Sequence, residues 1–163
     1  MANGQWIVVV SLADQILRVM RSAVVLAEYP VSTSRYGAGE QQGSNCTPRG
    51  GHVIRACIGS GLPEGAVFDA RRPTGQIYSP ELSRQLPDRD WILTRILWLS
   101  GTEAGRNRLG DVDTMRRYIY IHGTPASEPI GIPESHGCIR MRNRTVIELF
   151  DMVKPGTIVD IAP

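Results

Sequence analysis

Short β-like runs rich in apolar residues, separated by turn residues, constrain the fold of this chain more than any other feature. Successive side chains of a strand point to opposite faces of a sheet, so such runs predict half-buried β-strands. Such β-like runs occur at residues 6–11, 16–20, 24–31, 52–58, 91–99, 114–122 and 157–161, and the alternation is explicit at 91–99 and 114–122. In the sixth run it places Tyr118, Tyr120 and His122 on one face. The chain is therefore expected to be mostly β.

Four long loops and one helix complete the predicted outline. The loops cover residues 32–51, 59–75, 101–113 and 123–137, and loops of such length in a compact domain are usually functional. The helix is expected at residues 144–153, with Asn143 as its N-cap and Pro155-Gly156 ending it. Its buried stripe would be Val146, Ile147, Phe150 and Val153. We expect one domain over residues 1–163, a β-sandwich or partly closed barrel with one or two short helices.

Bulk properties exclude several classes of function. The net charge is only +2 over 163 residues, which does not indicate a nucleic-acid partner. No apolar run approaches the roughly 20 residues of a membrane span. Met1-Ala2-Asn3-Gly4 lacks the basic start of a secretory signal, which favours a cytoplasmic protein, or a periplasmic one if a leader has been removed. Three cysteines cannot form a complete disulfide framework, and free thiols suit a reducing compartment. A bridge between Cys46 and Cys57 is the alternative.

The residues suited to chemistry lie in the C-terminal third. His122 ends a predicted strand, and a loop separates it from Ser135-His136-Gly137-Cys138. A thiol becomes a good nucleophile when a neighbouring base or cation favours its thiolate. Gly137 permits tight backbone geometry, and the N–H groups of Gly137 and Cys138 are expected to face a developing oxyanion. This arrangement predicts a cysteine nucleophile with an imidazole base.

Other interpretations apply to the same residues. A lone cysteine in a β-protein is usually a small buried hydrophobe, and a histidine at a strand end often serves only as a hydrogen-bonding group. His122, His136 and Cys138 could also act as three zinc ligands, although their spacing matches no common zinc motif. The joint occurrence of histidines, glycines and cysteine in one loop system favours catalysis, and we expect no metal and no cofactor.

The segment from Ser135 to Arg140 resembles the signature of the L,D-transpeptidase (YkuD-domain) family. That signature is a histidine, a loop of about fifteen residues, and Ser/Thr-His-Gly-Cys followed by an apolar residue and Asn or Arg. The resemblance extends to residues 6–20, to Tyr29-Pro30-Val31-Ser32-Thr33, to Thr47-Pro48-Arg49-Gly50 and to residues 153–161. It therefore covers essentially the whole chain. Residues 34–46 and 59–89 match more weakly.

The resemblance implies a fold and a reaction. The fold would be the largely β sandwich of the family's catalytic domain. The reaction would be thiol attack on the bond that joins an L-centre, usually that of meso-diaminopimelate, to a terminal D-alanine in peptidoglycan tetrapeptide stems. Cys138 would be the nucleophile and His122 the general base, oriented by the backbone carbonyl of Gly123. His136 would shape the pocket.

Three further residues are expected to contact substrate. Arg140 follows Cys138 by two residues and would present its guanidinium on the same face, where it could bind a carboxylate. The alternative for Arg140 is a structural salt bridge. Tyr120 shares the predicted face of His122, although an inward tyrosine is more often part of a core, and Ser135 adjoins the nucleophile in the motif.

The motif leaves the fate of the acyl-enzyme open. Water would make the protein an L,D-carboxypeptidase, whereas an amine from a second stem would make it a crosslinking L,D-transpeptidase. The expected cytoplasmic location favours hydrolysis of soluble wall peptides during recycling. A non-catalytic wall-peptide-binding module is the alternative of another class, and an intact Cys138 and His122 argue against it. A different cysteine peptidase would show other spacings. The third stem residue and the oligomeric state stay open.

Overall fold

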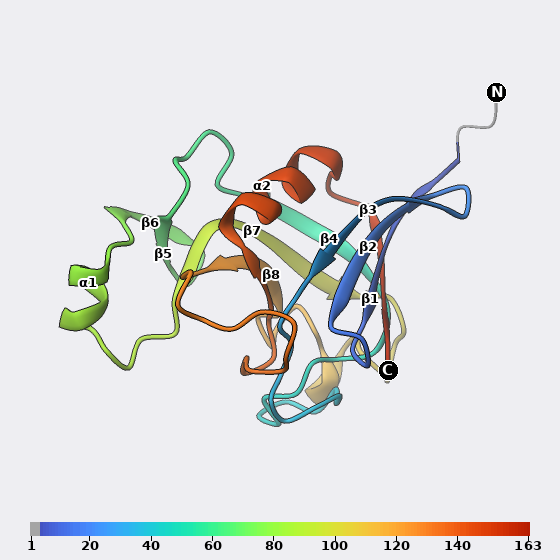
Figure 1. Ribbon diagram of the computed structural model, residues 1–163. Helices are drawn as coiled ribbons and strands as arrows, with labels where there is room; N and C mark the ends of the chain where they lie inside the picture. The colour runs from blue at the N-terminus through green and yellow to red at the C-terminus, as the bar shows by residue number, and fades with distance from the viewer. Residues whose placement is uncertain (1–3) are drawn as a thin grey trace.

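The computed structural model describes residues 4–163, which form one curled ten-stranded sheet and two short α-helices (Figure 1). The strands are β1 (Trp6–Ser11), β2 (Ile16–Arg21), β3 (Val24–Pro30), β4 (Gly50–Ile58), β5 (Ala66–Asp69), β6 (Arg72–Ile77), β7 (Ile92–Gly101), β8 (Tyr120–Thr124), β9 (Ile139–Arg142) and β10 (Ile158–Ala162). The helices are α1 (Pro80–Gln85) and α2 (Asn143–Met152), and Gly110–Val112 forms a 3-10 turn. The mostly-β prediction with one or two helices is confirmed.

The sheet follows the order β3-β2-β1-β10-β4-β7-β5-β6, and β8 pairs with both β7 and β9. Most neighbours are antiparallel, but β1 with β10 and β8 with β9 are parallel. The sheet curls into a half-barrel, and α2 packs across β7, β8 and β9 (Figure 1). The parallel β8–β9 pair matters most for function, because it joins the strand that carries His122 to the strand that follows Cys138.

Alternating residues of the central strands form the core. Val8 and Val10 of β1 are fully buried and contact Leu17 of β2, while Val146 and Leu149 bring the apolar face of α2 to the same cluster. Full burial of such an aliphatic side chain contributes about 1.5–3 kcal/mol to stability. This core is the rigid support on which β8 and β9 are held.

The strand predicted at residues 114–122 is wrong over its first half. Residues 114–118 form turns, and β8 begins only at Tyr120. Asp113 accounts for the difference, because its carboxylate accepts hydrogen bonds from the N–H groups of Leu109 and Arg116 and thereby folds the chain back. Tyr118 consequently has a positive φ of 56° and lies exposed, rather than on the face of Tyr120.

The loop predicted at residues 59–75 is also wrong in part. It contains β5 and the start of β6, which form a hairpin on the side of the sheet away from β1 (Figure 1). Every residue of β6 is exposed, so the strand carries no buried face and no alternating pattern. Helix α1 follows this hairpin, and Ser79 caps it by accepting a hydrogen bond from the N–H of Leu82.

The second helix lies close to its predicted place, but its cap and buried face differ. Helix α2 begins at Asn143 and its N-cap is Arg142, because the Asn143 amide is bonded to Thr94 instead. Its fully buried residues are Val146 and Leu149, and the predicted Ile147, Phe150 and Val153 are only partly buried. The buried face of α2 is therefore rotated toward Leu149 relative to the predicted one.

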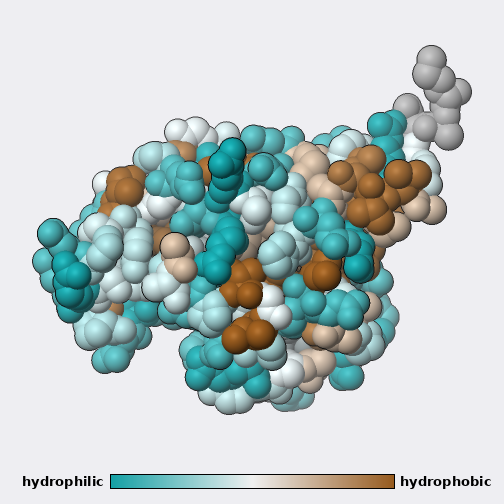
Figure 2. All heavy atoms as spheres, in the orientation of Figure 1, coloured by the Kyte–Doolittle hydropathy of each residue, from teal (hydrophilic) through white to brown (hydrophobic). Residues whose placement is uncertain are grey.

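Polar residues cover most of the face that Figure 2 shows. Figure 2 shows one brown patch over the hairpin that joins β2 and β3, where Val24, Val25 and Leu26 are exposed. No helix within residues 4–163 has the length and apolar character that crossing a bilayer would require. The thiols of Cys46, Cys57 and Cys138 are all free, as the composition suggested.

Candidate active site

The register of β8 and β9 brings the thiol of Cys138 and the imidazole of His122 to one face of the sheet. His122 lies beside Arg140 and Ile121 beside Ile139, so Cys138 lies beside Tyr120 at the start of the pair. The backbone N–H of Tyr120 donates to Cys138 Sγ at 3.3 Å. Residues two apart on a strand share a face, so His122 follows Tyr120 on the side of the thiol.

The Cys138 thiol is held between two backbone groups. It accepts from the N–H of Tyr120 and donates to the carbonyl of Tyr118 at 3.4 Å. The loss of solvent around the sulfur raises the pKa of Cys138 to about 12, against the lowering effect of the Tyr120 N–H. The thiol is therefore protonated in the resting protein at neutral pH.

His122 is fixed in one orientation. Its side chain is only 1% exposed, and Nδ1 lies 2.6 Å from the carbonyl oxygen of Gly123. A carbonyl only accepts, so Nδ1 carries the proton and Nε2 retains its lone pair. Burial lowers the pKa of His122 below its ordinary value of 6.5, although the Gly123 carbonyl opposes this shift. The imidazole is neutral at neutral pH and has one free basic nitrogen.

The turn before Cys138 is built from hydrogen bonds within the motif. The Ser135 hydroxyl donates to the carbonyl of Cys138 at 2.6 Å and accepts from the N–H of Gly137 at 3.2 Å. Ser135 is 1% exposed, so its hydroxyl is engaged inside the turn. The expectation that both N–H groups are free fails for Gly137. The N–H of Cys138 donates no hydrogen bond to the described residues.

Two glycines allow close approach at this site. Gly137 has a φ of +127°, and Thr47 Oγ1 donates to its carbonyl at 2.9 Å. A Cβ on Gly123 would meet the Leu93 carbonyl oxygen at 2.7 Å and would overlap the Asn143 amide. The residue after the histidine is therefore restricted to glycine in this chain.

The support behind Gly123 was not predicted from the sequence. Thr94, in an irregular part of β7, has a positive φ of 76° and donates from Oγ1 to Asn143 Oδ1 at 2.7 Å. A β-branched residue with this φ is a strained outlier. Thr94 and Asn143 both contact the position of Gly123, whose carbonyl orients His122. The strand pattern of β7 gives no sign of this irregularity.

Arg140 and His136 meet acidic side chains rather than the thiol. The Arg140 guanidinium lies 2.8 Å from Asp90 and 3.5 Å from Glu128, and its side chain is 7% exposed. This geometry matches the salt-bridge alternative. His136 is about half exposed, with Nδ1 3.7 Å from the same Asp90. Within residues 4–163, no three His, Cys, Asp or Glu side chains gather as a metal-binding group.

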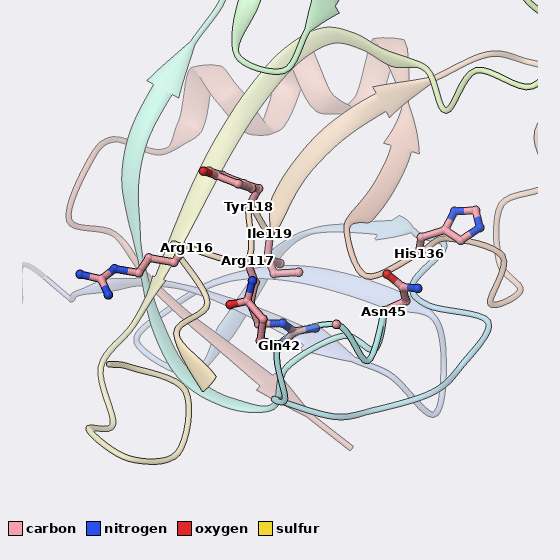
Figure 3. A pocket seen from close by; sticks show the side chains of 8 residues that line it. Gln42, Asn45, Arg116, Arg117, Tyr118, Ile119 and His136 are labelled. Carbon is pink, nitrogen blue, oxygen red and sulfur yellow. The ribbon is translucent and has the colours of Figure 1, made fainter. Parts of the chain in front are cut away.

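Two pockets flank the turn that contains Tyr118. The larger, about 370 Å³, contains the thiol and is lined by Ala70, Arg71, Ile92, Tyr118, Tyr120 and Cys138. The smaller, about 120 Å³, is lined mostly by polar residues: Gln42, Gly43, Asn45, Arg116, Arg117, Tyr118, Ile119 and His136 (Figure 3). In Figure 3 the Arg116 side chain extends away from the others. Tyr120, which was predicted to contact substrate, lines the thiol pocket. Ala70 and Arg71 come from the β5–β6 hairpin, which was predicted as part of a loop.

Curated proteins match short segments of this chain. The YkuD protein of Bacillus licheniformis is 48% identical over 48 residues, which are 29% of this chain and 29% of that protein. The YbiS protein of Escherichia coli K12 is 49% identical over 43 residues, 26% of this chain and 14% of that protein. Both carry the L,D-transpeptidase name. These matches span less than a third of each relative's length.

Solved structures match over nearly the whole chain. L,D-transpeptidase 3 of Mycobacterium tuberculosis, in complex with a faropenem-derived adduct, has a TM-score of 0.61 and 16% identity, covering 98% of this chain and 61% of that one. An L,D-transpeptidase of Mycobacterium smegmatis gives 0.56 and 19%, with 98% and 59% covered. At these identities the likeness establishes the fold. A model of the L,D-transpeptidase catalytic domain (YkuD) matches residues 5–161, so the chain belongs to that family and is an enzyme of it.

Proposed function

We propose that this protein cleaves the bond between the L-centre of the third residue, usually meso-diaminopimelate, and the terminal D-alanine of peptidoglycan tetrapeptide stems. Cys138 is the nucleophile and His122 the general base. The observation that carries the proposal is the 2.6 Å distance between His122 Nδ1 and the Gly123 carbonyl oxygen. The Gly123 carbonyl holds the Nδ1 proton and leaves the lone pair on Nε2, and His122 shares a strand face with the thiol.

The reaction begins from neutral partners. As Sγ attacks the carbonyl carbon, the thiol proton passes to Nε2 of His122 and the carbonyl oxygen becomes an oxyanion. The N–H of Cys138 is the donor best placed to stabilise that charge, because it has no acceptor within the described residues. The imidazolium then protonates the departing D-alanine amine, and the carbon–nitrogen bond breaks to leave a thioester.

The thioester has two possible acceptors, and we propose water. His122 removes a proton from the water molecule as it attacks, and the thiol of Cys138 is restored with a free carboxylate on the third residue. The protein would then act as an L,D-carboxypeptidase on soluble wall peptides in the cytoplasm. Crosslinking by an amine of a second stem is the other candidate, supported by the transpeptidase name of the relatives.

One incubation separates these proposals. The protein is incubated with a disaccharide tetrapeptide, with and without an amine acceptor, and the products are measured by mass spectrometry. Release of D-alanine alone supports the hydrolase, and a crosslinked product supports the transferase. Cys138→Ala is expected to abolish both, whereas Cys57→Ala, which removes a free thiol in β4, should retain turnover. Substantial turnover by Cys138→Ala would contradict the assignment of the nucleophile.

A further inference from the structure

The tip of the β5–β6 hairpin places a cation in the thiol pocket. Arg71 follows Ala70, whose φ of 53° makes the tight turn between the two strands. The Arg71 Cζ lies 4.6 Å from the ring centroid of Trp98 and 4.9 Å from that of Tyr118. Its Nη1 donates to the Tyr120 hydroxyl at 2.9 Å. Two aromatic rings and one hydrogen bond therefore fix the guanidinium in place.

The positive charge of Arg71 is not neutralised by the protein. No carboxylate within residues 4–163 forms an ion pair with it, and no acidic residue lines the pocket. Arg140 differs, because Asp90 and Glu128 already occupy its guanidinium. Of these two arginines, Arg71 is the one whose guanidinium has no carboxylate partner among the described residues.

Tyr120 links this cation to the reacting atom. Its backbone N–H contacts Cys138 Sγ and its hydroxyl contacts Arg71, so the guanidinium lies one tyrosine side chain away from the sulfur. Burial raises the pKa of Tyr120, so the phenol stays neutral and its oxygen accepts the hydrogen bond. Tyr120 is 2% exposed and cannot swing away without disturbing the core. The separation between cation and thiol is therefore set by a rigid spacer.

We propose that Arg71 is the carboxylate-binding residue of the thiol pocket and holds an anionic group of the substrate while Cys138 attacks. The proposal rests on the proposed function and specifies how the stem is recognised. Guanidinium groups pair with carboxylates through two parallel hydrogen bonds, which positions as well as binds. A tetrapeptide stem offers two such groups: the terminal carboxylate of D-alanine and the side-chain carboxylate of a diaminopimelate third residue.

The first test needs no turnover. Iodoacetate and iodoacetamide alkylate a thiol by the same displacement and differ in charge, so the ratio of their rates at Cys138 reports an anion site. Peptide mass mapping assigns each adduct to Cys138. Arg71→Met keeps the apolar stem on the two rings but removes the charge, and Arg72→Met is the control, because Arg72 is exposed and forms no ion pair in the described chain.

The ratio of iodoacetate to iodoacetamide rate is expected to fall about five- to tenfold in Arg71→Met, as a charge-assisted hydrogen bond predicts. It should be unchanged in Arg72→Met, with equal melting temperatures for both variants. An unchanged ratio in Arg71→Met would overturn the proposal. If the ratio falls in Arg71→Met but the wild-type protein releases no D-alanine, the anion site is supported and the proposed function is refuted.

The second test identifies the source of the carboxylate. Wild-type protein and Arg71→Met are compared on three tetrapeptides: the acid form, the form with a C-terminal amide, and the form with L-lysine as third residue. The variant should lose about tenfold in kcat/KM on the acid form. If the two proteins have equal kcat/KM on the C-terminal amide, Arg71 binds the terminal carboxylate. If they have equal kcat/KM on the peptide with L-lysine, Arg71 binds the side-chain carboxylate of diaminopimelate. Equal losses on all three peptides would contradict carboxylate recognition.

Discussion

At the residue scale, the site is a pair of neutral groups whose protonation depends on burial. The pKa of Cys138 is raised to about 12 and that of His122 is lowered, both chiefly by desolvation. Each charged form is disfavoured in the same low-dielectric surroundings, so a thiolate–imidazolium pair is not the resting state. The base must take the proton during attack, which makes the orientation of His122 more important than its basicity.

Replacement of the two histidines should separate their roles. His122→Ala is expected to lower kcat by about a thousandfold, the usual contribution of a positioned general base. His136→Ala, which removes an exposed ring near Asp90, should lower kcat less than about tenfold. Steady-state kinetics of D-alanine release provides the comparison. A larger loss in His136→Ala would reverse the assignment of the base.

The pH dependence of activity follows from the same two shifts. Only neutral His122 can accept the thiol proton, and its pKa is depressed, so the acid limb of kcat/KM should lie below an ordinary imidazole value. Activity should therefore be lost only at pH values below the ordinary 6.5, and it should stay flat toward the high pKa of the thiol. Alkylation of Cys138 by iodoacetamide should instead keep rising with pH. An alkylation rate already at its plateau at acid pH would indicate a resting ion pair.

At the element scale, the short turn from Ser135 to Cys138 aims the thiol, and β9 continues it into the sheet. The turn depends on the positive φ of Gly137 and on the proximity of Ile119, whose Cδ1 would lie 3.2 Å from an added Cβ. Thr47 and Ser135 complete it through hydrogen bonds to the carbonyls of Gly137 and Cys138. The turn therefore has little freedom to adjust.

A pair of glycine substitutions should measure that restriction. Gly137→Ala and Gly131→Ala both place a side chain on left-handed backbone, at φ of +127° and +92°, but only Gly137 has close neighbours. The backbone cost is about 1–3 kcal/mol in either case, and Gly137→Ala should lose more because its methyl group would also lie tightly against Ile119 and the Cys46 carbonyl. Urea unfolding gives the two free energies. Equal losses would show that the packing around Gly137 yields without cost.

Elements with an alternating pattern were predicted, and those without one were not. The strands β1, β2, β4 and β10 match their predicted ranges closely, because each buries every second residue in the core. Strand β6 lies at an edge with all residues exposed, so no periodicity marks it. Residues 114–118 alternate in sequence but turn in space, because the local hydrogen bonds of Asp113 outweigh the pattern.

At the scale of the whole molecule, the sheet buries two neutral histidines, and stability should therefore fall in acid. His52 is 0% exposed, with its ring nitrogens 2.9 Å from the Gly50 carbonyl and 3.0 Å from Thr114 Oγ1. Burial lowers the pKa of His52 as it does that of His122. The unfolded chain keeps the ordinary value of 6.5, so it binds more protons than the folded state as pH falls below that value.

The contribution of His52 can be isolated. His52→Gln removes one titrating group, so the slope of unfolding free energy against pH below about 6.5 should decrease by up to about 1.4 kcal/mol per pH unit. His136→Gln is the matched substitution at a half-exposed histidine, and its slope is compared with that of His52→Gln. Urea unfolding between about pH 5 and 8 provides the measurement. An equal slope in His52→Gln would show that His52 carries its proton in the folded state.

The sequence by itself determined the β class, most core strands, the family resemblance and the candidates Cys138 and His122, because these depend on local periodicity or on one contiguous motif. Only the tertiary structure decided which groups surround them. The engagement of Arg140 by Asp90, the support of Gly123 by Thr94 and Asn143, and the arrival of Arg71 beside the thiol all join residues distant along the chain. Such contacts arise from strand register and hairpin placement, which no local pattern in this chain specifies.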